Sequence, residues 1–111
     1  MRTKGIVTIG FVGCGGISHA HMAGIKVMGA TVMPEEGVWL ANERTEGIRQ
    51  AVNLWIRAKG NFDAVVDFDA AVRDPQHPGK LRAEFNSGDN IHLSDAGYQA
   101  VANAFDLNVF K

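Results

Sequence analysis

Residues 87–98 read SGDNIHLSDAGY, and this stretch indicates the fold most directly. Asp89 precedes His92 by three residues, and Ser94 is a good N-cap for a helix that follows at once. With that spacing, one turn can bring a carboxylate to one imidazole nitrogen and leave the other nitrogen free to take a proton from a hydroxyl. The pattern predicts Asp89 as the orienting acid and His92 as the general base of a Ser-His-Asp arrangement. The simpler alternative is a turn-capping aspartate beside a surface histidine.

The sequence around this pair resembles the last conserved block of the SGNH/GDSL hydrolases, a family of serine esterases and lipases. The likeness spans about residues 24–107 and includes three further segments: GIKVMGATVMPEEG (24–37), RQAVNLWIRAKG (49–60) and FDAVVDFDAAVRDP (62–75). The resemblance implies a hydrolase of small-molecule esters that needs no cofactor. It also implies that Asp89 and His92 are the catalytic pair.

Two features of that family are missing from the sequence. Its members run to about twice this length and carry a G-D-S block with the nucleophilic serine and a G-x-N-D block for the oxyanion hole, and neither block occurs here. The serines present are Ser18, Ser87 and Ser94, and none stands in the family's nucleophile context. We therefore expect a catalytically incomplete hydrolase, corresponding to a C-terminal part of the family or to a truncated form.

A glycine-rich segment near the start of the chain suggests a different chemistry. Gly13, Gly15 and Ser18 fit the pattern G-x-G-x-x-G/A between an expected strand and an expected helix. Backbone N–H groups in such a turn can cradle a pyrophosphate. Residues 6–24 resemble the opening Rossmann turn of the glucose-fructose oxidoreductase family of NAD(P)-binding proteins.

Several interpretations of this segment remain open. One alternative function is an NAD(P)-binding module, although the acids that would hold the ribose, Glu35 and Glu36, stand behind Pro34. The segment can equally be a glycine-rich turn chosen for tight packing. The two resemblances meet near residue 24, which suggests a chimeric or designed α/β protein without natural activity.

The order of strands and helices predicts one α/β domain over residues 1–111, a small three-layer α/β/α unit with a short parallel sheet of flavodoxin-like type. Apolar runs predict strands over 5–12, 25–33 and 64–68. Helices are expected over 17–24, over 45–59, as one turn over 69–73, and from residue 94 onward, with a long loop over 74–93. The helix over 45–59 is expected to pack through one apolar face: Ile48, Val52, Trp55 and Ile56. The last helix is expected to pack through Tyr98, Val101, Ala102 and Phe105.

Composition narrows the classes of protein. A net charge of −1 without a basic block argues against a nucleic-acid partner, and a single cysteine, Cys14, excludes an internal disulfide and a Cys-rich zinc site. We expect no metal. No apolar run reaches the ~20 residues of a membrane span. The N-terminus makes a poor signal peptide, so the protein is cytoplasmic or of unspecified location.

A thin sheet and a loop tryptophan, Trp39, predict a homo-oligomer. Three acids are expected to be solvated loop residues: Asp63, Asp67 and Asp69.

Overall fold

The computed structural model describes residues 26–110. The strand expected over 5–12, the helix expected over 17–24 and the glycine-rich turn lie outside the described residues. The elements in chain order are β1 (Met28–Ala30), α2 (Glu43–Arg57), β2 (Ala64–Val66), α3 (Phe68–Val72), β3 (Arg73–Asp74), β4 (His77–Leu81), η2 (Ala83–Phe85), α4 (Asp95–Asn103) and η3 (Leu107–Phe110).

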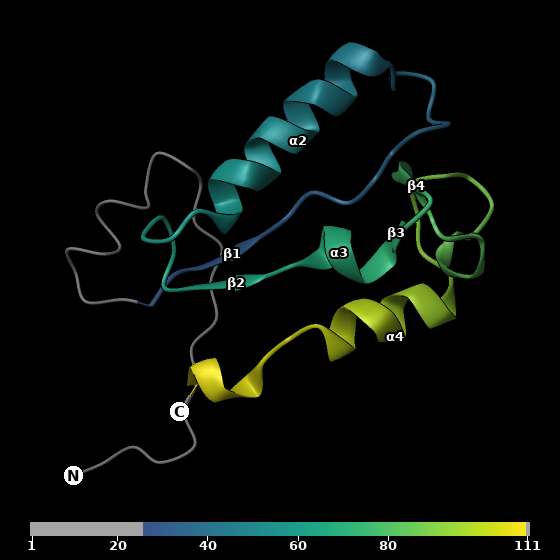
Figure 1. Ribbon diagram of the computed structural model, residues 1–111. Coiled ribbons are helices and arrows are strands. Elements are labelled where there is room, and N and C mark those ends of the chain that lie inside the picture. The colour runs from purple at the N-terminus through teal and green to yellow at the C-terminus, as the bar shows by residue number, and fades with distance from the viewer. Residues whose placement is uncertain (1–25, 111) are drawn as a thin grey trace, which may run out of the picture.

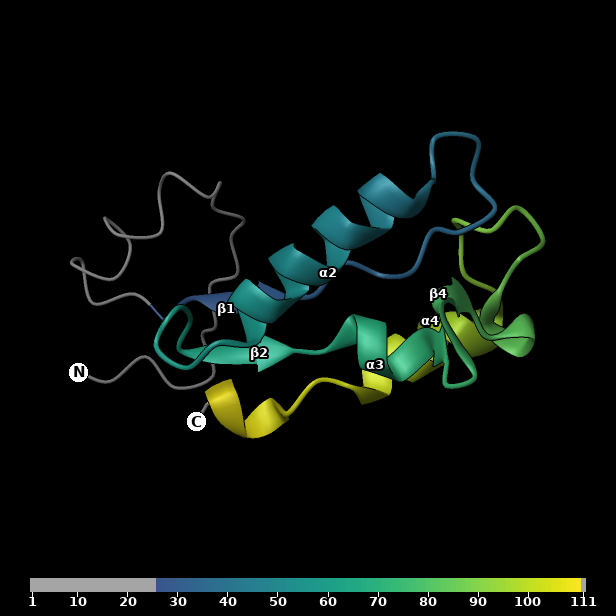
Figure 2. The ribbon, with the colours of Figure 1, turned by 45° about the horizontal axis from the view of Figure 1, so that its top comes forward.

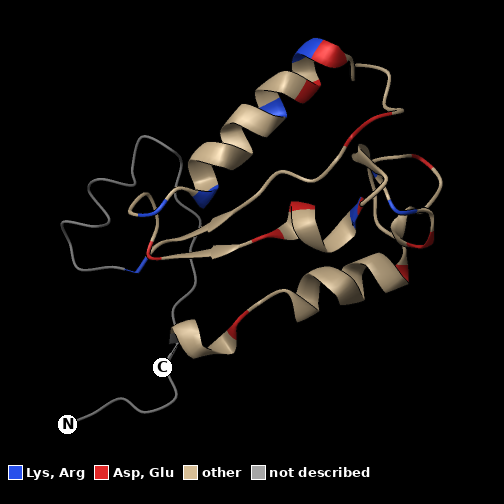
Figure 3. Cartoon of the chain, in the orientation of Figure 1, with Lys and Arg blue, Asp and Glu red and all other residues tan. Residues whose placement is uncertain are grey.

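The helices lie on both sides of a short parallel sheet. In Figures 1 and 2, α2 lies on one side of the β1–β2 pair, and the segment from α4 to η3 lies on the other. Met28 pairs with Ala64 and Ala30 with Val66, so β1, α2 and β2 form a parallel β-α-β crossover. Figure 3 shows no charged residue on either strand, although Ala30 of β1 and Val65 of β2 are exposed. The α/β class with a short parallel sheet is confirmed, and the flavodoxin-like strand order stays a prediction.

Two polar side chains of α2 end β1 earlier than the sequence predicts. The Val32 N–H donates to Asn53 Oδ1 at 2.7 Å. The Val32 carbonyl accepts from Asn53 Nδ2 at 2.8 Å and from an Arg49 guanidinium nitrogen at 2.9 Å. These backbone groups are thus satisfied by helix side chains instead of a neighbouring strand, and β1 has three residues in place of the expected run over 25–33.

The same contacts turn α2 away from the predicted orientation. The helix begins at Glu43 because Asn42 and Thr45 form a reciprocal capping box. Its buried residues are Arg49, Asn53 and Ile56. The predicted packing face was therefore wrong except at Ile56, and its other three members are exposed: Ile48, Val52 and Trp55.

The region over 74–93 is more ordered than the predicted loop. β3 and β4 pair as an antiparallel hairpin, and η2 follows directly. The sequence hides this hairpin because Pro75 and Pro78 argue against strands, yet proline is tolerated on edge strands such as β4.

A small core joins the hairpin, α3 and α4. Val72, Leu81 and Leu93 are its buried members, and Phe85 and Val101 pack against them. α4 begins after Ser94 as predicted. Its Tyr98, expected in the core, is instead half exposed. Trp39 is 87% exposed, and the homo-oligomer stays a prediction.

One pair of glycines gives a test of the α4 packing. At Gly97 a Cβ would lie 2.6 Å from the Phe85 carbonyl oxygen, so Gly97→Ala should destabilise the protein by about 1–3 kcal/mol despite the better helix propensity of alanine. At Gly47 in α2 a Cβ would meet no described atom within 4 Å, so Gly47→Ala should stabilise by up to about 1 kcal/mol. Urea denaturation measures both, and changes of the same sign would contradict this packing.

Candidate active site

The Asp89–His92 pair predicted from the sequence is formed. Asp89 Oδ2 lies 2.6 Å from His92 Nδ1. Asp89 Oδ1 accepts the backbone N–H groups of Ile91 at 3.0 Å and His92 at 2.8 Å, and the Ser87 hydroxyl at 3.2 Å. The two carboxylate oxygens therefore have separate roles, since Oδ1 holds the turn and Oδ2 holds the imidazole.

The electrostatics keep the Asp89 carboxylate ionised. The hydrogen bond from the His92 ring, followed by the two backbone N–H bonds, holds the pKa of Asp89 well below its usual range. An ionised carboxylate on Nδ1 requires the proton to sit on Nδ1, so the neutral imidazole presents Nε2 as an acceptor. Among the described residues no group hydrogen-bonds Nε2. The pair thus has the arrangement of a general base with its orienting acid.

The two residues that follow the Asp89–His92 turn, Leu93 and Ser94, hold it in place. Leu93 is buried in the core, and an isolated bridge joins it to Asn86. The Ser94 hydroxyl donates to the Glu84 carbonyl at 2.6 Å and accepts from the Gly97 N–H at 3.2 Å, which caps α4. The Asp89–His92 pair, called the dyad below, therefore projects from a closed loop at the N-terminus of α4. The His92 and Asp89 side chains are 71% and 49% exposed.

The serines within the described chain are engaged elsewhere. Ser87 donates to Asp89, and Ser94 donates to Glu84. Ser18 and the other two residues of the predicted pyrophosphate turn, Gly13 and Gly15, lie outside the described residues. The structure therefore brings together Asp89 and His92 and leaves both the nucleophile and the NAD(P) prediction untested.

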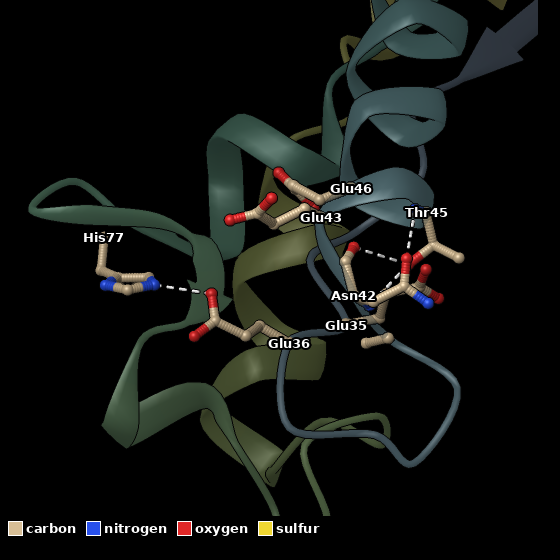
Figure 4. Close-up of a pocket in the computed structure, with 8 residues that line it drawn as sticks. Glu35, Glu36, Asn42, Glu43, Thr45, Glu46 and His77 are labelled. Carbon is tan, nitrogen blue, oxygen red and sulfur yellow. Dashed lines mark hydrogen bonds and ion pairs between the residues drawn. The ribbon is translucent and has the colours of Figure 1, made fainter.

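A second histidine–carboxylate pair was missed by the sequence analysis. His77 Nε2 lies 2.6 Å from Glu36 Oε2, beside a cavity of about 330 Å³ at the N-terminus of α2 (Figure 4). The partners stand 41 residues apart and come together only when β4 meets the segment before α2, so no local spacing could reveal them. The cavity is strongly acidic, because four glutamates line it together with His77: Glu35, Glu36, Glu43 and Glu46. Within the described chain no group of three or more such side chains could hold a metal ion.

The two acids of the strand-to-helix junction were predicted to be solvated, but both pair with arginines, and only Asp67 stays partly exposed. Asp69 is fully buried and binds Arg49, Arg57 and Arg73 at 2.7–2.8 Å. Asp67 caps α3 and binds Arg57 at 2.8 Å. Every one of these carboxylates is neutralised by arginine, so the cluster ties α2 to α3 and leaves no acid free for catalysis.

The remaining loop acid also has backbone partners. Asp63 Oδ2 accepts the Val27 N–H at 2.7 Å, and the Asp63 N–H donates to the Val27 carbonyl at 2.9 Å. This exchange holds the entrance of β1 against that of β2. Asp63 is exposed in the loop before β2, as predicted, and its carboxylate in addition holds a backbone group.

Comparison with known proteins identifies the family. The model of the GDSL-like Lipase/Acylhydrolase family matches residues 5–105, which includes both the glycine-rich segment and the dyad. No curated protein matches the chain. No helix within the described range is long and apolar enough to cross a bilayer. The Rossmann likeness and the chimeric origin stay predictions. Because the match extends over most of the sequence, the chain belongs to the GDSL-like lipase/acylhydrolase family.

Proposed function

We propose that this protein hydrolyses small-molecule esters with His92 as the general base and Asp89 as its orienting acid. The observation that carries the proposal is the 2.6 Å contact between Asp89 Oδ2 and His92 Nδ1, which leaves Nε2 open in the described chain. Family membership supports the reaction class. The general-base role follows from the imidazole's ability to exchange protons near neutral pH.

The reaction can be written for the residues present. Nε2 removes a proton from a water molecule as its oxygen bonds to the ester carbonyl carbon, and the tetrahedral intermediate carries the negative charge. The imidazolium, stabilised by Asp89, returns the proton to the leaving alkoxide as the carbon–oxygen bond breaks. We propose water as the nucleophile because Ser87 and Ser94 donate their hydroxyls elsewhere. Because the sequence lacks the G-x-N-D block that builds the family's oxyanion hole, the reaction should be slow.

The test is hydrolysis of p-nitrophenyl acetate. The wild type should hydrolyse this activated ester at a rate close to that of free imidazole. His92→Ala should remove the excess over the buffer rate because the base is lost. Asp89→Asn should lower the rate because the imidazole loses the carboxylate that fixes its tautomer. Ser18→Ala should have no effect.

His77→Ala is the matched control, since His77 has a carboxylate partner at the same 2.6 Å distance. Equal losses in His92→Ala and His77→Ala would contradict the proposal, because they would indicate nonspecific imidazole chemistry. A turnover near the ~10 s⁻¹ typical of enzymes, abolished by mutating one serine, would contradict the water mechanism and identify a nucleophile.

A further inference from the structure

The side-chain amide of Asn86 closes the loop that carries Asp89. Asn86 Oδ1 accepts the backbone N–H groups of Gly88 at 2.9 Å and Asn90 at 3.1 Å. Asn86 Nδ2 donates to Asn90 Oδ1 at 2.9 Å. Three hydrogen bonds from one side chain therefore fix the residues on either side of Asp89.

The backbone of this loop needs such support. Gly88 has φ of 121° and Asn90 has φ of 68°, so two positions that flank Asp89 lie in the left-handed region. Glycine reaches that region freely, and asparagine tolerates it better than most residues. A left-handed residue that is not glycine still costs free energy. The bonds from Asn86 to both N–H groups offset this cost.

Packing does not fix the orientation of the dyad. The Asp89 and His92 side chains are largely exposed, so hydrogen bonds within the loop must aim them. Asn86 holds the N–H groups of residues 88 and 90, while Asp89 Oδ1 holds those of residues 91 and 92. With these four donors satisfied, Asp89 Oδ2 is directed at the imidazole.

The Asn90 side chain also lies against a second segment of the chain. A Cβ at Gly37, itself at φ of 101°, would come within 2.7 Å of Asn90 Nδ2. The amide of Asn90 is thus confined between the backbone at residue 37 and the Asn86 side chain. A change at Asn86 would release Asn90, and with it the peptide that carries Asp89.

We propose that Asn86 is a positioning residue that aims Asp89 at His92 by closing the loop over residues 86–90. The catalytic meaning of this role rests on the proposed function. Asn86 itself touches no reacting atom. It acts through the geometry of the dyad, as outer hydrogen-bond partners do for other functional groups.

The test compares the variants Asn86→Ala and Asn86→Asp. The matched control is Asn103→Ala, which removes an exposed asparagine on α4 that accepts one hydrogen bond from Gln99. Nitrogen NMR of the His92 ring measures the share of the Nδ1–H tautomer, and carbon NMR follows the titration of the Asp89 carboxyl. In Asn86→Ala the Nδ1–H share should fall, and the titration midpoint of Asp89 should rise by about one pH unit toward the ~3.9 of a free aspartate. Asn86→Asp keeps the acceptor for both N–H groups and should retain more of the Nδ1–H tautomer than Asn86→Ala.

The outcomes separate this role from the proposed function. If Asn86→Ala matches Asn103→Ala in tautomer, titration and ester hydrolysis, the positioning role is wrong. If hydrolysis proves independent of His92 while the two NMR readouts still change, the proposed function fails and the positioning role stands. Should Asn86→Ala lose its folded amide spectrum, Asn90→Gly provides the same readouts, because it removes the acceptor of Asn86 Nδ2 and leaves the positive φ of residue 90 accessible. Changes in the same direction support the proposal, and unchanged readouts overturn it.

Discussion

Asp69→Asn is expected to lower the free energy of unfolding by about 3–5 kcal/mol, the cost of removing one partner from a buried ion pair. The Asp69 side chain is fully buried and its two oxygens bind three guanidinium groups. An asparagine there has one acceptor oxygen, and its NH₂ group would face an arginine that also only donates. Arg49, with its side chain 2% exposed, would be left with Glu46 as its remaining acid.

Asp106→Asn is the matched control for this change. Asp106 is exposed, and its carboxylate accepts one backbone N–H, from Asn108 at 2.9 Å. An asparagine oxygen can accept the same bond, so this variant should change stability by less than about 0.5 kcal/mol. Urea denaturation of both proteins measures the difference. Equal and small losses would mean that the buried cluster contributes little, and the assignment of Asp69 as its hub would be wrong.

The second large effect is expected in acid. Burial raises the pKa of Asp69, but the hydrogen bonds from Arg57, Arg49 and Arg73 outweigh it and leave the pKa lowered. The hydrogen bond from Arg57 lowers the pKa of Asp67 well below its usual range. A carboxyl whose pKa is lower in the folded protein stabilises the fold fully above its unfolded pKa, and this contribution is lost as the pH falls. Stability should therefore hold from pH 7 to about pH 5 and decline below the ~3.9 of an unfolded aspartate.

The slope of this decline reports how many carboxyls take up protons on unfolding, at about 1.4 kcal/mol per pH unit for each proton. Asp67 is partly exposed, so solvent screening makes its share smaller than that of Asp69. Urea denaturation at a series of pH values measures the slope, and Asp69→Asn should show a shallower decline than the wild type. The difference between the wild type and Asp69→Asn should therefore change below about pH 5, and a difference that changes only between pH 7 and pH 5 would contradict these pairings, since neither aspartate titrates there.

Local chemistry made the dyad predictable. Asp89 and His92 lie within one turn, and the cap at Ser94 is set by its neighbours, so local spacing together with the family resemblance predicted all three. The asparagine of the loop could have been found in the same way. NSGDN over residues 86–90 has the composition of an Asx turn, in which an asparagine side chain binds the backbone two residues on.

Nonlocal partners made the rest unpredictable. Apolar periodicity favoured the wrong face of α2, because the reason to bury Arg49 is the Val32 carbonyl, which lies 17 residues away in the sequence. Asp69 was predicted to be solvated because its partner Arg49 lies 20 residues away. Polar groups are buried where a partner is present, and a one-dimensional pattern does not record that partner.

The ion-pair cluster around Asp69 also restricts which substitutions this sequence can accumulate. Three arginines from two elements share one carboxylate, so a change at Asp69 alters the effect of a change at Arg49, Arg57 or Arg73. If Asp69 is replaced first, the three arginines lose their shared carboxylate. If one arginine is replaced first, Asp69 still has two arginine partners. The low-cost routes replace the acid together with its buried arginine by apolar residues of similar volume. Substitutions at these four residues are therefore energetically coupled. The order in which they occur decides which intermediate sequences still fold.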